Sequence, residues 1–596
     1  MPIYQAPISD FRFLINEVLE AEQRDALPSA ESAGEDIIDA VLSEGAKFCE
    51  SVLQPLNGIG DTEGCSFDNG DVRTPAGFRD AYESYCQAGW PGLTSDPEFG
   101  GQGLPLYLGL AMAEMITASN TSWGMYPALS HGAWALIHRH GSEDQKSMFL
   151  PNMISGKWTG TMNLTESHCG TDLGLIRSRA EPEGDDRYRI SGTKIWISAG
   201  DHDLAENIIH LVLARLPDAP EGTRGISLFI VPKFEVGADG DSGQPNGVRC
   251  AGIDHKMGIK GSATCEIIFD NATGYLVGEP HRGLHYMFTM MNGARLETGI
   301  QGLGLASVAY QNAVEFARER LQGRSLDGAK FPDKPADPII VHPDVRRMLM
   351  ISRAFIEGAR GIGLWTALKL ECEHFHPDES VRAQAGHWVA LMTPIIKAWF
   401  TDMGFEVTNH GVQVHGGAGY ILDTGVEQFV RDARITRIYE GTNGIQALDL
   451  VGRKLVAANG ETVKSFFDEA ESLLADIGDD ESMAEFTDPL KTALERLKAT
   501  TGWVYQHMAR NPLEAGAAST DYLNLFALTA MAWSWTLQAR AARRGLENGA
   551  MTEGFYNNKL ITARFFMQRM LPETEGLKSR IKAGAEAMMA MEADDF

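Results

Sequence analysis

The segment that indicates the fold is Thr161-Met162-Asn163-Leu164-Thr165-Glu166-Ser167-His168-Cys169-Gly170-Thr171-Asp172-Leu173-Gly174, because the sequence pattern changes there. Before it, from about residue 36 to 158, apolar residues recur at helical spacing. After it, short runs of β-type residues alternate with turn residues, which is typical of an antiparallel barrel or sandwich of about 120 residues. The runs are 188–190, 194–197, 208–213, 226–231 and 266–269.

Helical spacing returns at about residue 283 and continues to the end of the chain. We therefore expect a mostly α protein with an inserted antiparallel β-domain. The expected regions are an N-terminal extension (1–35), a helical domain (36–158), a β-barrel domain (159–280), a helical bundle (281–455) and an additional helical domain (456–596). The extension has an apolar helical stripe and no partner element of its own, so it is expected to dock on the rest of the chain or on another protein.

Composition excludes some classes of partner. The 596 residues carry 52 Lys and Arg against 80 Asp and Glu, which gives a formal net charge of −28. Such a surface repels phosphate, so we expect neither bare nucleic acid nor an anionic membrane as partner. The apolar stretch 523–537 is too short and too polar for a membrane span and predicts a buried helix. Seven cysteines without a CxxC pair, and a start without a signal-peptide pattern, indicate a reducing, cytoplasmic compartment.

The sequence does not support a Rossmann dinucleotide site, a serine-nucleophile site or a metal site. Gly302-Leu303-Gly304 lacks the third glycine of a dinucleotide-binding fingerprint and lies in a helical pattern, which argues against a Rossmann fold. No GxSxG nucleophile motif occurs. Acidic and histidine residues at 371–376 have the types that bind metals, but their mixed facing favours a solvated turn, so no metal site is predicted.

Two segments stand out, and a glycine-rich stretch lies upstream of the second. Gly and Thr residues within 161–174 expose backbone N–H groups, as anion sites need, although an ordinary strand-to-loop transition explains them equally well. In 437–446, Glu440 lies between Tyr439 and a Gly-Thr-Asn-Gly turn. Burial beside Tyr439 would make this carboxylate a usable base, whereas the alternative is an exposed Glu at a helix end. Upstream, the glycine-rich stretch 413–419 allows phosphates to approach the backbone closely.

Taken together, these segments resemble the acyl-CoA dehydrogenase family over about residues 36–455. The resemblance rests on four motifs in the family's order and spacing: Leu164-Thr165-Glu166 with Gly170-Thr171-Asp172, the strand Lys194-Ile195-Trp196-Ile197-Ser198, the loop from Gln413 to Gly419, and Tyr439-Glu440-Gly441-Thr442. It implies a helical, β-barrel and helical fold and an FAD-dependent oxidation of an acyl-CoA thioester to the trans-2-enoyl-CoA. In that reaction a glutamate base removes the α-proton while a hydride passes from Cβ to flavin N5.

The resemblance also assigns roles by position. Glu440 is the expected base, and Arg295 the arginine that supports its placement. The expected substrate contacts are Thr171, Tyr439, Glu440 and Gly441. FAD, between the β-domain and the second helical domain, is expected to contact Met162, Leu164, Thr165, Gly170, Thr171, Trp196, Ser198, Arg320, Gln413, Gly416, Gly417, Thr442 and Gly444. Because the matches of Arg320 and Gln413 reach a neighbouring subunit's FAD, the resemblance implies a homo-oligomer, with a dimer favoured over a tetramer.

The chain departs from the family pattern at two places. Ser167-His168-Cys169 stands where many relatives have Pro-Gly-Ala, and the contacts of that loop are left open. Asp344 follows an insertion at 325–340 and stands near where relatives carry a FAD-contacting Gln, so that role is not carried over.

Both extensions resemble a larger bacterial subgroup of the family. That subgroup includes enzymes acting on 3-methylmercaptopropionyl-CoA in dimethylsulfoniopropionate breakdown, so this thioester is the expected substrate. Medium-chain, long-chain or aryl acyl-CoA substrates of fatty-acid β-oxidation are the alternatives. Met287, Met290 and Met291 would line a soft pocket for a thioether or, as the favoured alternative, fill the core.

Electron-transferring flavoprotein is the expected electron acceptor. An acyl-CoA oxidase, which would pass the electrons to O₂, is the first rival hypothesis. A nucleic-acid-associated member of the fold and an inactive scaffold are the others.

Overall fold

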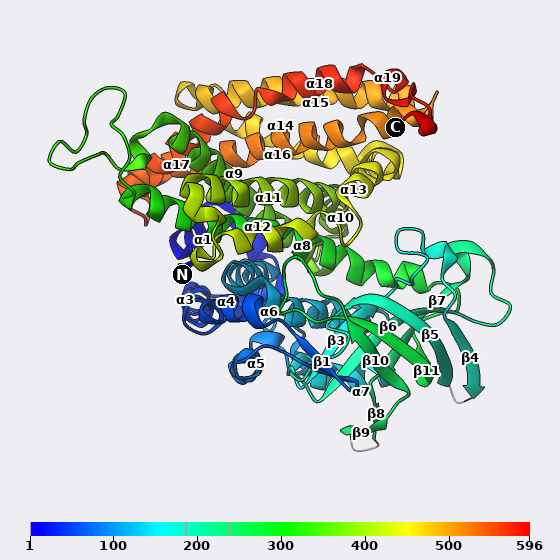
Figure 1. The fold of residues 1–596 in the computed structure, drawn as a ribbon. Helices are drawn as coiled ribbons and strands as arrows, with labels where there is room; N and C mark the ends of the chain where they lie inside the picture. The colour runs from blue at the N-terminus through cyan, green and yellow to red at the C-terminus, as the bar shows by residue number, and fades with distance from the viewer. Residues whose placement is uncertain (1, 185–186, 238–239) are drawn as a thin grey trace. The chain divides into compact units, whose positions relative to one another are not determined.

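The computed structural model describes residues 2–184, 187–237 and 240–596 (Figure 1). It divides into two compact units. Unit 1 comprises Met1–Ala46, Pro105–Ala118 and Thr298–Phe596, and unit 2 comprises Lys47–Leu104 and Ser119–Glu297. Helices dominate the described chain, and every strand within it belongs to unit 2. The expected fold class, mostly α with an inserted β-domain and extra C-terminal helices, is confirmed.

Unit 2 holds a seven-stranded sheet and two short two-stranded sheets. The large sheet contains β3 (Trp158–Asn163), β4 (Arg179–Gly184), β5 (Arg187–Ser198), β6 (Asn207–Arg215), β7 (Ile226–Pro232), β10 (Val248–Ile253) and β11 (Thr264–Leu276). The short sheets pair β1 (Ser66–Asp68) with β2 (Asp71–Arg73) and β8 (Phe234–Val236) with β9 (Ser242–Pro245). Each predicted β run lies within one of these strands, and the runs 188–190 and 194–197 form the single strand β5.

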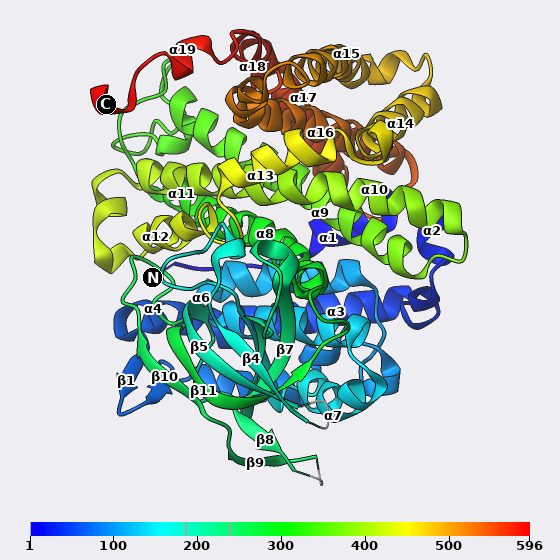
Figure 2. The ribbon, with the colours of Figure 1, turned by 90° about the vertical axis from the view of Figure 1, so that its right-hand side faces the viewer.

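The pairings close the large sheet into a barrel, and its neighbouring strands β10, β11, β5 and β4 lie side by side in Figure 2. β5 pairs with β11 and β4, β7 pairs with β11 and β6, and β4 meets β6 where Arg179 lies opposite Arg215. Most of these pairs are antiparallel, as expected. β3, however, runs parallel to β6 along its whole length. A parallel pair needs a long connection between its strands, and the passage through β4 and β5 supplies it.

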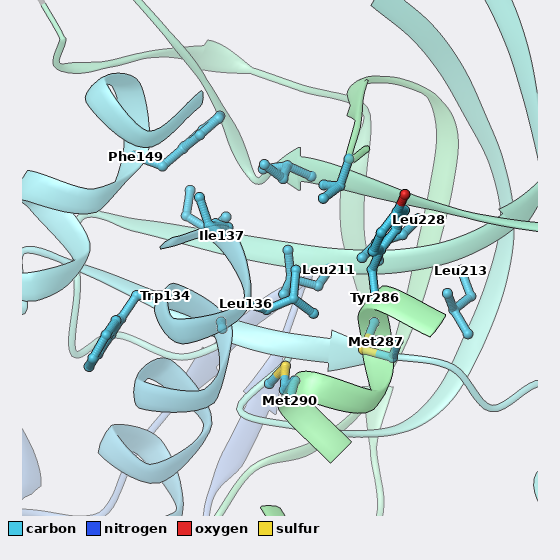
Figure 3. Close-up of a cluster of buried hydrophobic side chains, with 14 of the residues drawn as sticks. Trp134, Leu136, Ile137, Phe149, Leu211, Leu213, Leu228, Tyr286, Met287 and Met290 are labelled. Atoms are coloured by element: carbon cyan, nitrogen blue, oxygen red, sulfur yellow. The ribbon is translucent and has the colours of Figure 1, made fainter. Parts of the chain in front are cut away.

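The helices of unit 2 are α4 (Gln54–Glu63), α5 (Phe78–Gln87), α7 (Glu143–Ile154), the C-terminal part of α6 (Leu106–His140) and the N-terminal part of α8 (Gly283–Glu319). Figure 3 shows the core that α6, α7 and α8 form with the strands, in which Met287 and Met290 point among leucine and aromatic side chains. Both methionines are at most 1% exposed, and Met291 packs against the same cluster. Their core-filling interpretation is therefore confirmed for Met287 and Met290.

Unit 1 is built from helices. They are α1 (Ile8–Phe13), α2 (Ala21–Asp25), most of α3 (Glu35–Phe48), α9 (Pro343–Phe375), α10 (Glu379–Ile395), α11 (Thr401–His415), α12 (Glu427–Thr436), α13 (Asn443–Asp449), α14 (Glu461–Ile477), α15 (Ala484–Met508), α16 (Pro512–Asn548), α17 (Glu553–Arg569), α18 (Glu573–Lys582) and α19 (Glu586–Met589), together with parts of α6 and α8. Shorter turns include the π-helical η1 (Leu14–Val18) and η9 (Ile396–Phe400) and the 3₁₀ turn η10 (Gly416–Tyr420).

The apolar stretch 523–537 lies in α16, which is buried as expected. It packs on α9 through polar as well as apolar groups, because the Trp535 indole donates to the Ala354 carbonyl at 3.0 Å and the Ser534 hydroxyl donates to the Gly358 carbonyl at 2.9 Å. Within the described residues, no helix combines the length and the apolar character that crossing a bilayer requires.

The expectation of a solvated turn at residues 371–376 is wrong. α9 continues through Phe375, and Glu371 is only 2% exposed. Its carboxylate accepts hydrogen bonds from the Leu106 backbone N–H at 2.9 Å and from the Ser29 hydroxyl. A run of polar residues does not show which side of a helix another segment will cover, and here residues distant in sequence cover one of them.

The N-terminal extension docks within unit 1, and its first residues lie along α8. The Asn312 side-chain amide bonds both backbone groups of Ile3, accepting its N–H at 2.9 Å and donating to its carbonyl at 2.8 Å. Gln311 does the same for Gln5 at 2.9 Å each way. These four bonds recognise only the backbone of the extension. Phe11, Phe13 and Ile15 of the extension are fully buried, whereas Ile3 is 55% exposed.

A buried cluster of charges fixes the extension to α6, α9 and α17. Arg360 of α9 is 2% exposed and pairs with Asp10 of α1 and with Glu114 of α6. Lys559 of α17 is 1% exposed, pairs with Asp10 and lies 2.9 Å from Glu357. Burial alone would raise the pKa of Asp10, but the charges of Lys559 and Arg360 hold it below its ordinary value. These ion pairs therefore tie elements from both ends of the sequence into one core.

We expect Arg360→Met to destabilise unit 1 strongly, because it leaves the buried carboxylates of Asp10 and Glu114 without their shared partner. Removing one member of a buried ion pair typically costs about 3–5 kcal/mol. Urea unfolding followed by tryptophan fluorescence measures the change. Arg347→Met, on an exposed part of the same helix, is the matched control and should cost less than about 1 kcal/mol. Equal stability of the two variants would contradict a structural role for the cluster.

Candidate active site

Glu440 lies in unit 1, on the turn between α12 and α13, and is half-buried. The backbone is left-handed at two successive residues, with φ of +59° at Glu440 and +82° at Gly441. Gly441 adopts this conformation freely, but at a residue with a Cβ atom it costs roughly 1–2 kcal/mol. Other contacts must therefore hold Glu440 in place. Thr442 and Gly444 follow directly and are exposed, as a cofactor contact requires.

Asn443 anchors this turn to the neighbouring helices. Its side-chain nitrogen lies within hydrogen-bond distance of three oxygens: the Ala398 carbonyl at 3.0 Å, the Thr401 hydroxyl at 2.9 Å and the Asp402 carboxylate at 2.9 Å. Its side-chain oxygen accepts a hydrogen bond from the ammonium group of Lys397 at 2.8 Å. Lys397 is fully buried in η9. The base of the turn is thus fixed by a polar network.

Tyr439 precedes Glu440 and packs inward. Its phenol donates a hydrogen bond to the side-chain oxygen of Gln301 on α8. Burial, and to a smaller extent the nearby charge of Glu440, raises the pKa of Tyr439 above its ordinary value. The phenol therefore stays protonated and keeps its role as donor.

In unit 2, the loop that follows β3 is organised around Glu166. This carboxylate is 5% exposed and accepts hydrogen bonds from Lys194 at 2.9 Å, from the Ser178 hydroxyl at 2.7 Å and from the Arg177 backbone N–H at 2.7 Å. Burial alone would raise its pKa, but the Lys194 charge and these hydrogen bonds lower the pKa of Glu166 to about 2. Glu166 is therefore a permanent anion at neutral pH.

The same lysine fixes the residues expected to face the flavin. Lys194 donates a second hydrogen bond to the Leu164 carbonyl at 3.0 Å, and the Ile195 N–H donates to the Thr165 carbonyl at 3.0 Å. Gly170 returns close to this point, since a Cβ atom added there would lie 3.4 Å from the Thr165 methyl group. Thr165 and Gly170 are thus brought together, as the resemblance implies, on a loop tied to β5.

The surface beside this loop suits a flat aromatic cofactor. Trp196 is 65% exposed, with a left-handed φ of +57° that turns it away from the regular strand. An exposed indole, together with the half-buried Met162 and Thr165, offers a flat apolar face and a hydroxyl group. The Ser198 carbonyl accepts the Thr161 hydroxyl at 2.6 Å, which fixes β5 against β3. These residues fit the isoalloxazine ring of FAD.

The residues that depart from the family pattern form a closed turn. Glu166 and Cys169 exchange backbone hydrogen bonds of 2.9 and 3.0 Å, and a His168 ring nitrogen lies 2.9 Å from the Leu175 carbonyl oxygen. Ser167 is exposed on this turn, as is Thr171 just beyond it. The loop therefore keeps a defined shape without the Pro-Gly-Ala that many members of the resembled family have here.

The roles expected of the remaining residues stay predictions. In unit 1, Arg320 follows the end of α8, Gln413 lies in the last turn of α11, and Gly416 and Gly417 begin η10. All four are exposed, as residues that reach a second subunit's cofactor would be. Arg295 lies in the unit 2 part of α8 and is 7% exposed.

Some residues that shape the site receive no role from the sequence. Glu166 and Lys194 both lie in the motifs that carry the resemblance, yet nothing local indicates that they pair, because the pairing depends on β5 passing beside the loop. Asn443 has the pattern of an ordinary turn residue, and Lys397 that of one cation in an apolar helix. Their contact appears only when η9 lies under the turn. Asp344, which the sequence left without a role, is exposed in the first turn of α9.

Comparison with known proteins identifies the family. Four family models match in succession: the acyl-CoA dehydrogenase N-terminal domain at residues 42–157, its middle domain at 161–272, its C-terminal domain at 281–455, and an acetyl-CoA dehydrogenase C-terminal-like domain at 461–592. The chain belongs to the acyl-CoA dehydrogenase family. It is an FAD-dependent acyl-CoA dehydrogenase, as the resemblance predicted.

Relatives match this dehydrogenase along nearly its whole length. It is 42% identical over 597 residues to the 3-methylmercaptopropionyl-CoA dehydrogenase of Ruegeria pomeroyi, covering 98% of this chain and 99% of that one. It is 34% identical over 612 residues to a butyryl-CoA dehydrogenase of Syntrophomonas wolfei, covering 100% and 99%. The crystal structure of a Bacillus anthracis acyl-CoA dehydrogenase complexed with FAD superimposes with a TM-score of 0.74 at 20% identity, over 98% of this chain and 92% of that one. The extra helices at both ends are therefore shared with other family members.

We expect Glu166→Gln to destabilise unit 2 at pH 7 and much less in acid. The pKa of Glu166 in the folded chain is about 2, against an ordinary value of 4.5. Its charge therefore contributes its full stability above about pH 4.5, and this contribution is lost as the pH falls toward 2. The difference from the natural protein should be on the order of 3 kcal/mol at pH 7 and roughly half of that at pH 3.

Urea unfolding at pH 7 and pH 3 checks this, with Glu221→Gln, at an exposed position of unit 2, as the control. A stability difference that stays constant between the two pH values would show that the Glu166 charge is not the cause.

Proposed function

We propose that Glu440 is the base that removes the α-proton of an acyl-CoA thioester. The observation that carries this proposal is the placement of a half-buried carboxylate on a rigid left-handed turn, at the position where the family has its base. The α-proton of a thioester is weakly acidic, so a base must be held close to it with little freedom to reorient. Asn443 and its network supply that rigidity.

The thioester carbonyl must be polarised as the α-proton leaves. We propose that the backbone N–H of Glu440 donates to this oxygen, as in other family members. Such a donor acts like one member of an oxyanion hole, and losing one typically costs about 10²–10³ in rate. Tyr439 and Gly441 flank the base and are proposed substrate contacts, together with Thr171. Arg295 is proposed to support the placement of the base.

We propose FAD contacts at the positions that match the cofactor contacts of the family. In unit 2, Thr165 and Trp196 would hold the isoalloxazine. The other proposed contacts are Met162, Leu164, Gly170, Thr171 and Ser198 in unit 2 and Thr442 and Gly444 in unit 1. When bound, FAD supplies the acceptor for the hydrogen that leaves Cβ.

A second subunit completes this proposal. Arg320, Gln413, Gly416 and Gly417 are exposed on unit 1 and are proposed to contact the cofactor of a neighbouring copy of the chain. A chain that contributes to its neighbour's cofactor site must assemble in order to work. We therefore propose a homodimer, with a tetramer as the alternative.

The proposed substrate is 3-methylmercaptopropionyl-CoA. The 42% identity to an enzyme named for that thioester supports it. A straight-chain acyl-CoA is the second candidate, because the butyryl-CoA dehydrogenase also matches along the whole chain. We propose electron-transferring flavoprotein as the electron acceptor. All seven cysteines are free thiols, which supports a reducing compartment such as the cytoplasm as the place of action.

Glu440→Gln should retain FAD and lose flavin reduction by substrate. The amide has nearly the same shape but cannot accept the α-proton, so anaerobic addition of acyl-CoA should leave the yellow colour of the flavin unbleached, with a rate at least about 10³-fold lower. Glu406→Gln, on the exposed side of α11, is the control and should bleach at the normal rate. Normal bleaching in the Glu440 variant would remove the base assignment.

The substrate proposal predicts the highest kcat/KM for 3-methylmercaptopropionyl-CoA in a panel that also contains butyryl-, octanoyl-, palmitoyl- and phenylpropionyl-CoA. The assay uses electron-transferring flavoprotein as acceptor and monitors hydrogen peroxide in parallel. One extra or missing methylene in an apolar pocket changes kcat/KM by about 10–200-fold, so the ranking should be clear. A strong preference for palmitoyl-CoA would overturn the substrate, and stoichiometric peroxide would favour an oxidase.

A further inference from the structure

We infer that Gln446 is a positioning residue for the reaction: its side-chain amide holds Glu440 in the left-handed conformation from which that carboxylate and its backbone N–H act. This inference rests on the proposed function of Glu440. It concerns a residue outside the proposed substrate and cofactor contacts, which acts through the backbone of the base.

Gln446 lies on α13, six residues after Glu440, and is fully buried. Its side-chain nitrogen donates to the Glu440 carbonyl oxygen at 3.0 Å and lies 3.4 Å from the Gly441 carbonyl oxygen. Both carbonyls of the left-handed pair therefore face one buried amide. The bond to the Glu440 carbonyl fixes the plane of the peptide that joins Glu440 to Gly441, and with it the direction in which the backbone leaves Glu440.

The turn needs a stabilising hydrogen bond of this kind, because the left-handed conformation is unfavourable for a residue with a Cβ atom such as Glu440. Hydrogen bonds from a buried donor to the carbonyls of Glu440 and Gly441 offset the strain. The fit is close, since a Cβ atom added at Gly441 would lie 2.8 Å from the Gln446 nitrogen. Glycine at 441 is what allows the amide to reach both carbonyls.

The environment of the Gln446 side-chain oxygen indicates that the side-chain nitrogen, as a hydrogen-bond donor, is the group that acts on the turn. The Gln446 side-chain oxygen is buried and has no hydrogen-bond partner among the described residues. Leaving a buried polar atom unsatisfied is unfavourable, so an amide at this position costs stability on its oxygen side. Its nitrogen side, which reaches Glu440 and Gly441, is where the residue makes its contribution.

Gln446 and Asn443 hold different parts of the turn. Asn443 bonds to η9 and to the start of α11, so it sets where the turn sits. Gln446 bonds to the carbonyls of Glu440 and Gly441, so it sets which way the base points. Loss of Gln446 should therefore misdirect the carboxylate while leaving the turn attached to its helices.

The test is Gln446→Met, which keeps the length and the burial of the side chain and removes the donor. We expect the rate constant for anaerobic flavin reduction, and with it kcat in turnover, to fall about 10- to 100-fold. Small misplacements of a reacting group cost rates of this size. KM for the acyl-CoA should change by less than about threefold, because Gln446 is not a substrate contact. The FAD content should match that of the natural protein.

The matched control is Gln428→Met. Gln428 is a buried glutamine of α12 that bonds to Asp432 of its own helix. The substitution removes the same amide from the same unit, so any general effect of burying methionine for glutamine appears in both variants. We expect Gln428→Met to leave kcat within about twofold of the natural value.

A double mutant separates positioning from a general loss of structure. If Gln446 acts through Glu440, then adding Gln446→Met to Glu440→Gln should leave the residual rate of the single Glu440 variant unchanged within about twofold. A further drop, or a natural kcat in Gln446→Met, would overturn the inference. If Gln446→Met does not yield folded flavoprotein, Gln446→Asn, which keeps an amide but withdraws it by one methylene, must show the same loss of kcat.

Failure of the proposed function gives a different result. If the natural protein is not bleached by any acyl-CoA in the panel, or if Glu440→Gln bleaches normally, the function of Glu440 itself is wrong. If the natural protein bleaches, Glu440→Gln does not, and Gln446→Met bleaches at the natural rate, then only the positioning role of Gln446 is wrong.

Discussion

A charge taken out of water must meet an opposite charge or a set of hydrogen bonds, and unit 1 is built around that constraint. Arg360 is buried where the N-terminal extension, α6 and α9 meet, and its two carboxylate partners come from residues 10 and 114. Lys559 brings the added C-terminal helices to the same point. No single segment can satisfy these charges alone, so the ion pairs join the extension and the added helices to the central helices.

The same constraint shapes the loops that serve the chemistry. Lys194 is wholly buried in unit 2, and its ammonium group is satisfied by the Glu166 carboxylate and the Leu164 carbonyl. Lys397 is equally buried in unit 1 and reaches the amide oxygen of Asn443. Each lysine holds a loop that also carries outward-facing residues. A loop held from behind by a buried cation can expose its functional groups and still keep their positions.

Strand and helix segments follow from periodicity because each repeats one local pattern. The runs at 208–213 and 226–231 lie in β6 and β7, and the apolar stretch at 523–537 lies in a buried helix. Gly302 and Gly304 are glycines because neighbouring backbone lies too close for a side chain. A Cβ atom at Gly302 would lie 2.6 Å from the Phe400 carbonyl oxygen, and one at Gly304 would lie 3.0 Å from the Ala118 nitrogen. The parallel pairing of β3 and the burial of Glu371 were not predictable, because each depends on a segment far away in the sequence.

The sequence by itself determined the family, the order of helical and β regions, and the identity of Glu440 as the candidate base, since all three depend on residue types at short, fixed spacings. Only the tertiary structure decided which groups hold those residues: Gln446 on the carbonyls of Glu440 and Gly441, and Lys194 on Glu166. The physical reason is that a hydrogen bond or a buried ion pair depends on distance in space, which a chain sets by folding distant segments together and does not record in its local pattern.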